Sequence, residues 1–490
     1  MRPVCSVFAI AVMIFLFQTT NAQLCKGSLG DPIVNITFGS GTNPGKSLIA
    51  AATTYQYQAS VCPNDGFYTV CNSTSGCFSD SWHTLSADHT GNTNGYFMLV
   101  NASYQPGAFY LDTVRGICSN TTFEFAAWVC NLLRPSACSG NGIEPNLTFS
   151  IEKTDGTVLS TFNTGNIPTT SSPSWKQVGF FFTTPVGVTD VVLRMVNNAP
   201  GGCGNDIALD DITLRPCGPD IKTSIVGASS NSVSFCEGEA HTYTLTGTVM
   251  AGYTNPSLQW QKNFNDSGWV DIPGAHATTL AVNLPSSMKE GTYMYRLTAV
   301  ETDNIGSTAC RTAANPISII INPTPYANAG PDKTILEGDV AQPEGVATGG
   351  NIDYSWSPVL NMNNAQSLNP EVTPPTSTDY VLSVVSKFGC GTVTDTMHVF
   401  VLKDFFVPNA FTPNRDGIND TWNIPALKGL PNFEIRVFNR YGQLVFHTRN
   451  NFIGWNGKFN GTDQPVGLYV YLVNIENGKR ILKGPLALIR

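Results

Sequence analysis

The feature that most constrains the fold of this chain is the high frequency of turn-forming residues along it. The 490 residues include 45 glycines and 31 prolines, and short runs rich in β-branched and aromatic residues stand between them. Beyond the first 22 residues, no helical periodicity of useful length appears. Such a pattern is typical of strands joined by turns. The chain is therefore predicted to be all-β and to form a multidomain series of β-sandwiches.

Composition narrows the class of function. Only 13% of the residues are charged and the net charge is -8, so no basic stripe is present to neutralise phosphates. This balance argues against nucleic acid as a partner. The length predicts roughly three to five domains.

The N-terminus has the features of a secretory signal peptide. Arg2 supplies a basic start, Val7 to Phe17 form an apolar run, and Ala22 ends a small-residue cleavage site. The apolar run is too short to span a bilayer, and Leu24 before Cys25 does not fit a lipoprotein cleavage site. We expect residues 1–22 to be removed, with no transmembrane segment in the rest of the chain.

The cysteines mark one disulfide-bearing domain, predicted at residues 23–217, with Gly218 to Asp220 as its exit. Nine cysteines fall in this region: Cys25, Cys62, Cys71, Cys77, Cys118, Cys130, Cys138, Cys203 and Cys217. Zinc is the competing interpretation of clustered cysteines. No CxxC pair occurs and the spacings do not repeat, so disulfides are preferred.

Two tandem modules follow, predicted at residues 218–322 and 323–402. Leu258 to Trp260 in the first corresponds to Tyr354 to Trp356 in the second, and each module continues with a tyrosine-bearing strand. A strand with a buried tryptophan and a later tyrosine strand are typical of an immunoglobulin-like sandwich. The second module also resembles a PKD-type domain, although it lacks the Asp-Phe-Gly-Asp-Gly motif of that family.

The same repeat leads to a disulfide prediction. Cys236 and Cys310 of the first module are expected to pair, whereas the position equivalent to Cys236 in the second module is Leu336. Cys390 should therefore be outside any bridge in its own module. A link of Cys390 to the N-terminal domain or to a second chain is then the informative outcome of peptide mapping.

The last module, residues 403–490, carries a set of motifs in a fixed order. They are Phe405 to Trp422, Ile435 to Phe446, Trp455-Asn456-Gly457, and Pro465 to Tyr471. This run resembles the gliding-motility-associated C-terminal domain, the type B sorting signal of the type IX secretion system in Bacteroidota. The resemblance implies the type IX secretion machinery as a partner, export across the outer membrane, and a place at the cell surface or outside the cell.

A loop of this module is a candidate calcium site. Asn414, Asp416 and Asp420 place side-chain oxygens around Gly417, as calcium loops do. The loop is shorter than an EF-hand loop and lacks its closing glutamate. Asx residues with glycine also form turns without any ion, so both alternatives stay open.

The strand pattern of residues 23–217, which ends at Asn205 to Leu214, resembles the jelly-roll of carbohydrate-binding modules of the 4/9 type and, more loosely, MAM-type adhesion domains. Such jelly-rolls often hold a structural calcium ion with an acidic residue of the last strand, where Asp210 and Asp211 stand. Two adjacent acids in an apolar strand are costly to bury unpaired. The alternative is that one faces solvent, because neighbours on a strand point to opposite faces.

Saccharide binding requires exposed aromatic faces with polar groups beside them. The candidates for ligand binding are Trp82, Tyr96, Tyr104 and Tyr110. Trp82 lies in a polar run and is expected to be exposed. Trp128 and Trp175 lie in apolar strands and are expected in the core.

Catalytic signatures are not found, so no enzyme activity is predicted. His-Glu-x-x-His, Gly-x-Ser-x-Gly and phosphate-binding glycine loops do not occur, and His83, His89 and Asp88 form only a loose cluster. Paired carboxylates of a glycosidase stay possible because their pairing is spatial. The expected function is a secreted or cell-surface protein whose N-terminal domain binds a glycan or surface polymer. The alternatives are a structural adhesin or matrix component, and an unrecognised polysaccharide hydrolase.

Overall fold

A computed structural model describes residues 24–402, 406–428, 430, 432–451, 453–475, 478 and 480–490. The predicted signal peptide lies outside these residues. Nearly all regular structure is β, as predicted, and the described helices are five short 3-10 turns. The chain divides into two compact units. The first runs to Val233 and includes His241–Leu284 and Thr292–Ile319, and the second holds the remainder.

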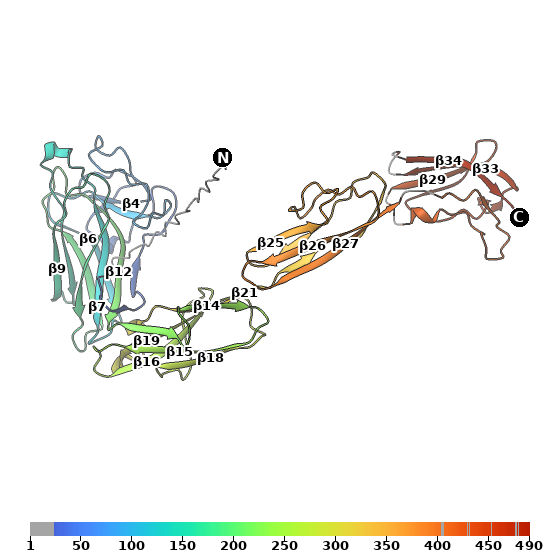
Figure 1. Cartoon of the computed structure of the whole chain (residues 1–490). Coiled ribbons are helices and arrows are strands. Elements are labelled where there is room, and N and C mark those ends of the chain that lie inside the picture. Colours follow the sequence, from blue (N-terminus) through green and yellow to red (C-terminus); the bar gives the residue numbers. More distant parts are fainter. Residues whose placement is uncertain are drawn as a thin grey trace, which may run out of the picture. The chain divides into compact units, whose positions relative to one another are not determined.

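Two sheets make up the N-terminal sandwich (Figure 1). The larger sheet has the order β10-β7-β12-β5-β4-β3, and two further strands, β1 and β2, pair with β12. The bounds of its strands are β1 Ser28–Leu29, β2 Val34–Ile36, β3 Gln56–Tyr57, β4 Phe67–Cys71, β5 Phe97–Val100, β7 Thr122–Asn131, β10 Lys176–Thr183 and β12 Ile207–Gly218. The smaller sheet has the order β6-β11-β8-β9, with β6 Gly107–Arg115, β8 Asn146–Glu152, β9 Val158–Asn166 and β11 Asp190–Asn197.

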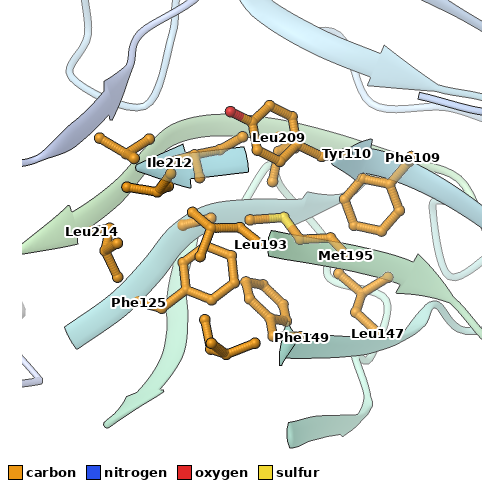
Figure 2. Packing of buried hydrophobic residues seen from close by; sticks show 14 of the residues in the cluster. Phe109, Tyr110, Phe125, Leu147, Phe149, Leu193, Met195, Leu209, Ile212 and Leu214 are labelled. Atoms are coloured by element: carbon orange, nitrogen blue, oxygen red, sulfur yellow. The ribbon is translucent and has the colours of Figure 1, made fainter. Parts of the chain in front are cut away.

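The core of this sandwich lies between the two sheets. Figure 2 shows Leu209 and Leu214 of the larger sheet among side chains of the smaller one, including Leu193. The rings of Phe125 and Phe149 meet edge to face, with centroids 5.4 Å apart. Because strand side chains alternate between faces, the inner residues fix which residues of β7 and β12 point outward.

The next module has a three-stranded and a six-stranded sheet. The first has the order β13-β15-β18, and the second has the order β14-β21-β19-β16-β17 with β20 paired to β19. The bounds are β13 Ile221–Ile225, β14 Ser232–Cys236, β15 His241–Val249, β16 Pro256–Phe264, β17 Val270–Asp271, β18 Thr279–Leu284, β19 Gly291–Glu301, β20 Thr312–Ala313 and β21 Ile317–Asn322. Trp260 on β16 is fully buried, as the repeat pattern predicted.

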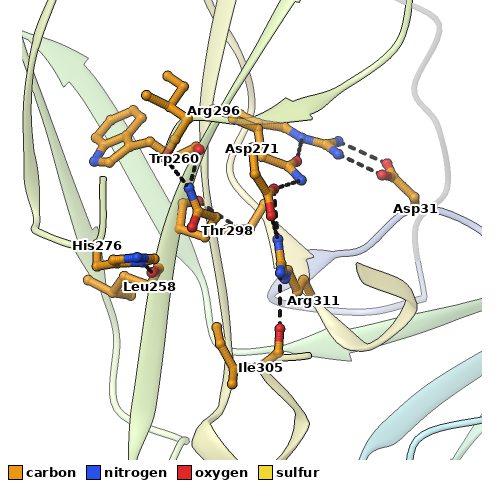
Figure 3. Close-up of polar contacts among 12 residues, drawn as sticks. Asp31, Leu258, Trp260, Asp271, His276, Arg296, Thr298, Ile305 and Arg311 are labelled. Carbon is orange, nitrogen blue, oxygen red and sulfur yellow. Dashed lines mark hydrogen bonds and ion pairs between the residues drawn. The ribbon is translucent and has the colours of Figure 1, made fainter. Parts of the chain in front are cut away.

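The N-terminal sandwich and this module are joined covalently and electrostatically within the first unit. A disulfide connects Cys118 to Cys310. Arg296, whose side chain is 8% exposed, donates two hydrogen bonds to the Asp31 carboxylate at 2.8 and 2.6 Å (Figure 3). These hydrogen bonds lower the pKa of Asp31. A bidentate arginine pair fixes orientation as well as distance, so this junction is built from specific contacts.

The third module pairs β22 Tyr326–Asn328 with β24 Val346–Thr348. Beside this pair stands a sheet of order β23-β27-β26-β25, with β23 Lys333–Leu336, β25 Ile352–Ser357, β26 Thr378–Ser386 and β27 Thr392–Leu402. Trp356 is 1% exposed.

The C-terminal module has a sheet of order β28-β34-β33-β29-β30 and a small hairpin of β31 and β32. The bounds are β28 Ala410–Phe411, β29 Phe433–Phe438, β30 Leu444–Arg449, β31 Lys458–Phe459, β32 Thr462–Asp463, β33 Gly467–Ile475 and β34 Arg480–Leu488. Trp422 and Trp455 are buried in its core.

The disulfide prediction for Cys236 and Cys310 is wrong. Cys236 pairs with Cys390 across Cα atoms 5.4 Å apart, whereas Cys310 pairs with Cys118. The repeat alignment equated Cys310 with Cys390, but their local structures differ. Cys310 ends a 3-10 turn after β19, and Cys390 lies in the tight turn between β26 and β27. Equivalent sequence positions therefore do not face equivalent partners.

Three more bridges, Cys25–Cys217, Cys62–Cys77 and Cys138–Cys203, lie within the N-terminal sandwich, as its cysteine density predicted. Cys71 and Cys130 are free thiols there, and both are buried.

Candidate functional site

The strongest candidate site is a pocket of about 370 Å³ on the outer face of the larger N-terminal sheet. Strands β1, β2, β7, β10 and β12 and the loop before β5 contribute to it. The residues that line it are Leu29, Pro32, Asn35, His89, Thr90, Glu124, Trp128, Gln177, Asp211, Thr213 and Arg215. Most of these side chains are polar, and Trp128 is the aromatic one beside His89.

The alternation of β7 explains why Trp128 and Glu124 face this pocket. Phe123, Phe125 and their alternate neighbours on β7 belong to the inner core. The intervening residues must point to the other face, and Trp128 accordingly lies half-buried at the pocket instead of in the core. The expectation that Trp128 is a core residue is wrong. Trp175 is also only half-buried, and it packs edge to face on Phe97 at 5.9 Å.

A β-bulge in β12 builds the acidic part of the site. The register of β12 against β7 shifts between Asp210 and Thr213, and Asp211 has a positive φ of 40°. A bulge inserts one extra residue in a strand. Leu209 and Ile212 therefore both face the core, while Asp210 and Asp211 both turn toward His89. Of the two alternatives left open for these acids, the placement on opposite faces is wrong because the bulge interrupts the alternation, although Asp210 does accept backbone donors.

His89 completes the cluster. Its Nδ1 lies 3.3 Å from Oδ2 of Asp210 and 3.2 Å from Oδ2 of Asp211. The imidazole stacks on Trp128, with centroids 4.5 Å apart and an angle of 18° between the planes. Asp210 is held in turn by backbone N–H donors of His89 at 3.2 Å and of Asp211 at 2.8 Å. The ligand-type atoms of the three residues all lie within 4.8 Å of one another.

Burial perturbs the acids of the site. The pKa of Asp211 is raised to about 6 by desolvation and by the neighbouring charge of Asp210. Desolvation also raises the pKa of Glu124, which is 1% exposed and accepts a hydrogen bond from the Cys25 N–H at 2.6 Å. Negative charge is therefore disfavoured here unless a cation or a donor compensates it.

Two polar atoms of the pocket have no hydrogen-bond partner among the described residues. They are Oε1 of Gln177, which is an acceptor, and Nε of Arg215, which is a donor. Gln177 lies directly opposite Trp128 in the pairing of β10 with β7. Buried polar atoms are normally hydrogen-bonded, so Gln177 and Arg215 have unused hydrogen-bonding capacity beside this pocket.

The aromatic residues predicted to bind ligand are not brought together. Trp82 is 2% exposed, and its Nε1 donates to Oδ2 of Asp206 at 3.0 Å, so its predicted exposure is wrong. The polar run around it encloses a small satellite core, in which Trp82 packs with Leu85 and Leu132. Tyr110 is also buried, at 4% exposure.

The other two tyrosines differ in environment. Tyr96 is half-buried and donates from its hydroxyl to the Thr42 carbonyl at 2.6 Å. Tyr104 is 67% exposed and lies outside the pocket. His83, grouped in the sequence with His89 and Asp88, is buried and is not part of the metal-type cluster.

The sequence contains a pattern that predicts the bulge in β12. Apolar residues fall at odd positions, Ile207 and Leu209, and then at even positions, Ile212 and Leu214. Such a change of parity within one strand requires a bulge between the two pairs.

In the predicted calcium loop of the C-terminal module, the side-chain oxygens accept hydrogen bonds from backbone N–H groups. Asp420 accepts from the N–H groups of Arg415 at 2.6 Å and Gly417 at 2.8 Å. Asp416 accepts from Ile418 at 2.7 Å, and Asn414 accepts from Asp416 at 3.0 Å. These bonds form the turn that was the alternative to an ion, and a calcium ion at this loop stays a prediction.

Comparison with known proteins identifies the C-terminal module. Residues 405–488 match the CHU_C type IX secretion signal domain. No curated protein matches the chain. Within the described residues, no helix is long and apolar enough to cross a membrane. The protein is thus exported by type IX secretion, to the cell surface or to the medium.

Several solved structures are similar to parts of this chain at low identity. Extracellular domains 3–5 of Drosophila OTK are 12% identical, with 55% of this chain and 96% of that chain covered and a TM-score of 0.24. Domains A168–A170 of titin are 14% identical, with coverage of 55% and 97% and a TM-score of 0.26. The fibronectin(III)-like modules of Clostridium thermocellum CbhA are 12% identical, with coverage of 37% and 95% and a TM-score of 0.16. None of these likenesses bears on function.

Proposed function

We propose that this exported protein binds a glycan or another hydroxyl-rich surface polymer through the outer-face pocket of its N-terminal sandwich. The observation that carries the proposal is that one pocket is lined by the ring of Trp128 and by two residues with polar atoms that have no hydrogen-bond partner in the described part of the chain, Gln177 Oε1 and Arg215 Nε. Aromatic rings contact the C–H faces of sugars, while a few placed polar groups bind the hydroxyls. The two Ig-like modules act as spacers between this domain and the secretion signal.

In this proposal the ring of Trp128 makes the apolar contact with the sugar, and the polar groups around it orient the sugar. Asn35, Gln177 and Arg215 offer amide and guanidinium groups around it. A pocket of about 370 Å³ has room for one or two sugar units, since small-molecule sites begin at roughly 300 Å³.

A glycan array with the full chain tests the proposal. Gln177→Ala should reduce retention at least tenfold without altering the melting temperature, because Oε1 has no partner among the described residues. Trp128→Ala should abolish retention. Tyr104→Ala is the matched control, since it removes an exposed aromatic ring outside the pocket. Loss of retention in Tyr104→Ala, or full retention in both pocket variants, would refute the pocket as the binding site.

A role without catalysis is part of the same proposal. Incubation of the protein with plant and bacterial polysaccharides should release no reducing ends. Release that is lost on Glu124→Gln would instead establish the hydrolase alternative. An absence of any retained glycan, polymer or product would support the structural adhesin.

A further inference from the structure

We infer that His89, Asp210 and Asp211 bind a divalent cation of the zinc type at the edge of the outer-face pocket. The cluster combines one imidazole nitrogen with two carboxylates. Calcium prefers oxygen ligands alone, whereas zinc accepts histidine and aspartate together. The donor set therefore differs from the all-oxygen site expected of Asp210 and Asp211 from the sequence.

The separations between His89 and the two acids are compatible with a shared metal ion. Zinc bonds of about 2.0 to 2.2 Å in tetrahedral geometry place two donor atoms roughly 3.4 Å apart. Nδ1 of His89 lies 3.3 and 3.2 Å from its two carboxylate oxygens. The imidazole therefore sits at the separation of a co-ligand. The contact of His89 Nδ1 with Asp210 also meets the criterion of a hydrogen bond, so the choice of a metal rests on the donor set of one imidazole and two carboxylates.

The surroundings hold the three donors in place. Asp210 is fixed by two backbone N–H groups, and the imidazole of His89 is stacked on Trp128. Metal ligands are typically oriented by such contacts. The bulge at Asp211 supplies the third ligand, because without it this side chain would point into the core.

A position for a fourth ligand faces the pocket. His89 and Asp211 both line the pocket, whereas Asp210 lies behind them with a side chain only 2% exposed. Neighbouring hydroxyls or a carboxylate of a bound saccharide would reach the cation from that side, a step that rests on the proposed glycan binding. The cation site itself does not depend on it.

Metal binding is tested with metal alone. The untagged full chain, stripped with EDTA and dialysed, is titrated calorimetrically with Zn²⁺, and with Ca²⁺ and Mg²⁺ as comparators. One Zn²⁺ per chain is expected, together with the visible absorption of tetrahedral Co²⁺ after Co²⁺ substitution. Asp211→Asn, which keeps the shape of the side chain, and His89→Gln should each weaken binding at least tenfold.

Asp88→Asn is the matched control, because Asp88 is adjacent in sequence but outside the ligand set. It should retain binding within threefold. Stoichiometric Zn²⁺ binding that is unchanged in both ligand variants, no binding at all, or displacement of Zn²⁺ by equimolar Ca²⁺ would overturn the inference. Repeating the glycan array in EDTA separates the two proposals, since retention without metal leaves glycan binding intact whatever the calorimetry shows.

Discussion

The burial of Trp82 leads to a stability prediction that can be worked out from its contacts. The side chain is 2% exposed, packs on Phe78 with ring centroids 4.8 Å apart, and donates a hydrogen bond to Asp206. Replacing a core tryptophan by alanine costs about 3 to 5 kcal/mol. With about 2 to 4 °C per kcal/mol for a domain of this size, Trp82→Ala should lower the melting temperature by roughly 6 to 20 °C.

Trp82→Phe separates packing from hydrogen bonding. The ring stays but the N–H donor is lost, so Asp206 keeps only its bond from the Ala102 N–H at 3.1 Å. Leaving a buried acceptor unsatisfied costs about 1 to 3 kcal/mol. The cost should be larger at pH 8 than at pH 5, because the pKa of Asp206 is raised by burial to about 7 and its charged form needs the donor most.

Differential scanning calorimetry of the chain without residues 1–22 measures both variants. Tyr104→Ala, an exposed aromatic in the same sandwich, is the control and should shift the transition by less than about 2 °C. A Trp82→Ala protein that melts within 2 °C of the wild type would show that Trp82 is exposed and that the satellite core around it does not form.

Three further predictions concern Asp206, the Cys236–Cys390 bridge and the loop of Asp420. Because burial raises the pKa of Asp206 to about 7, the folded state keeps this carboxyl group protonated between about pH 4 and pH 7, whereas the unfolded state does not. The free energy of unfolding should therefore fall by up to about 4 kcal/mol as pH rises through that window and be constant above it, as measured by urea unfolding. Non-reducing peptide mapping should recover Cys236 linked to Cys390, whereas a Cys236 to Cys310 peptide would contradict the structure. Replacing both cysteines by serine should lower the free energy of unfolding by about 5 kcal/mol, as the chain-entropy account gives for a separation of 154 residues. Asp420→Ala removes the acceptor of two backbone N–H groups and should destabilise the C-terminal module by about 0.5 to 2 kcal/mol; an added stabilisation of the wild type by Ca²⁺, lost in EDTA, would establish the predicted ion at that loop.

Local patterns in the sequence were sufficient for the fold class and for the buried tryptophans of the Ig-like modules. Trp260 and Trp356 stand in strands whose apolar alternation points inward, and both are buried. Trp82 was mispredicted because its neighbours are polar. Its burial depends on distant partners, Asp206 and Leu132, that no local pattern contains.

The candidate site was predictable only in part, for a similar reason. Asp210 and Asp211 were recognised from the cost of burying adjacent acids, but His89 joins them across 121 residues. The wrong disulfide prediction for Cys310 also arose because its partner is far away in the sequence. Cys118 and Cys310 are 192 residues apart, and repeat alignment compares positions within a module instead of contacts between modules.

The bulge at Asp211 leads to a last prediction, in which a deletion removes a site without breaking the strand. Asp210 pairs with Trp128 and Thr213 with Ala126, so β12 uses three steps where β7 uses two. Deleting Asp211 makes the register continuous, and Leu209, Ile212 and Leu214 then alternate inward without interruption.

The other neighbours of β12 permit this deletion. On that edge β5 pairs with residues 207–209 and β2 with residues 212–214, so two separate strands meet β12 on either side of the bulge. The deletion should therefore fold with a melting temperature within about 4 °C of the wild type, since relief of the positive φ at Asp211 offsets small shifts of β2. Zn²⁺ binding should be lost, because the third ligand is gone. Deleting Thr213 is the matched control, since it also makes the residue count continuous but places Asp211 at the inward position opposite Ala127 and Ile212 at the outward position opposite Ala126. A deletion of Asp211 that unfolds as readily as that control would show that the bulge is required for the sandwich itself, and that the site is a by-product of the fold.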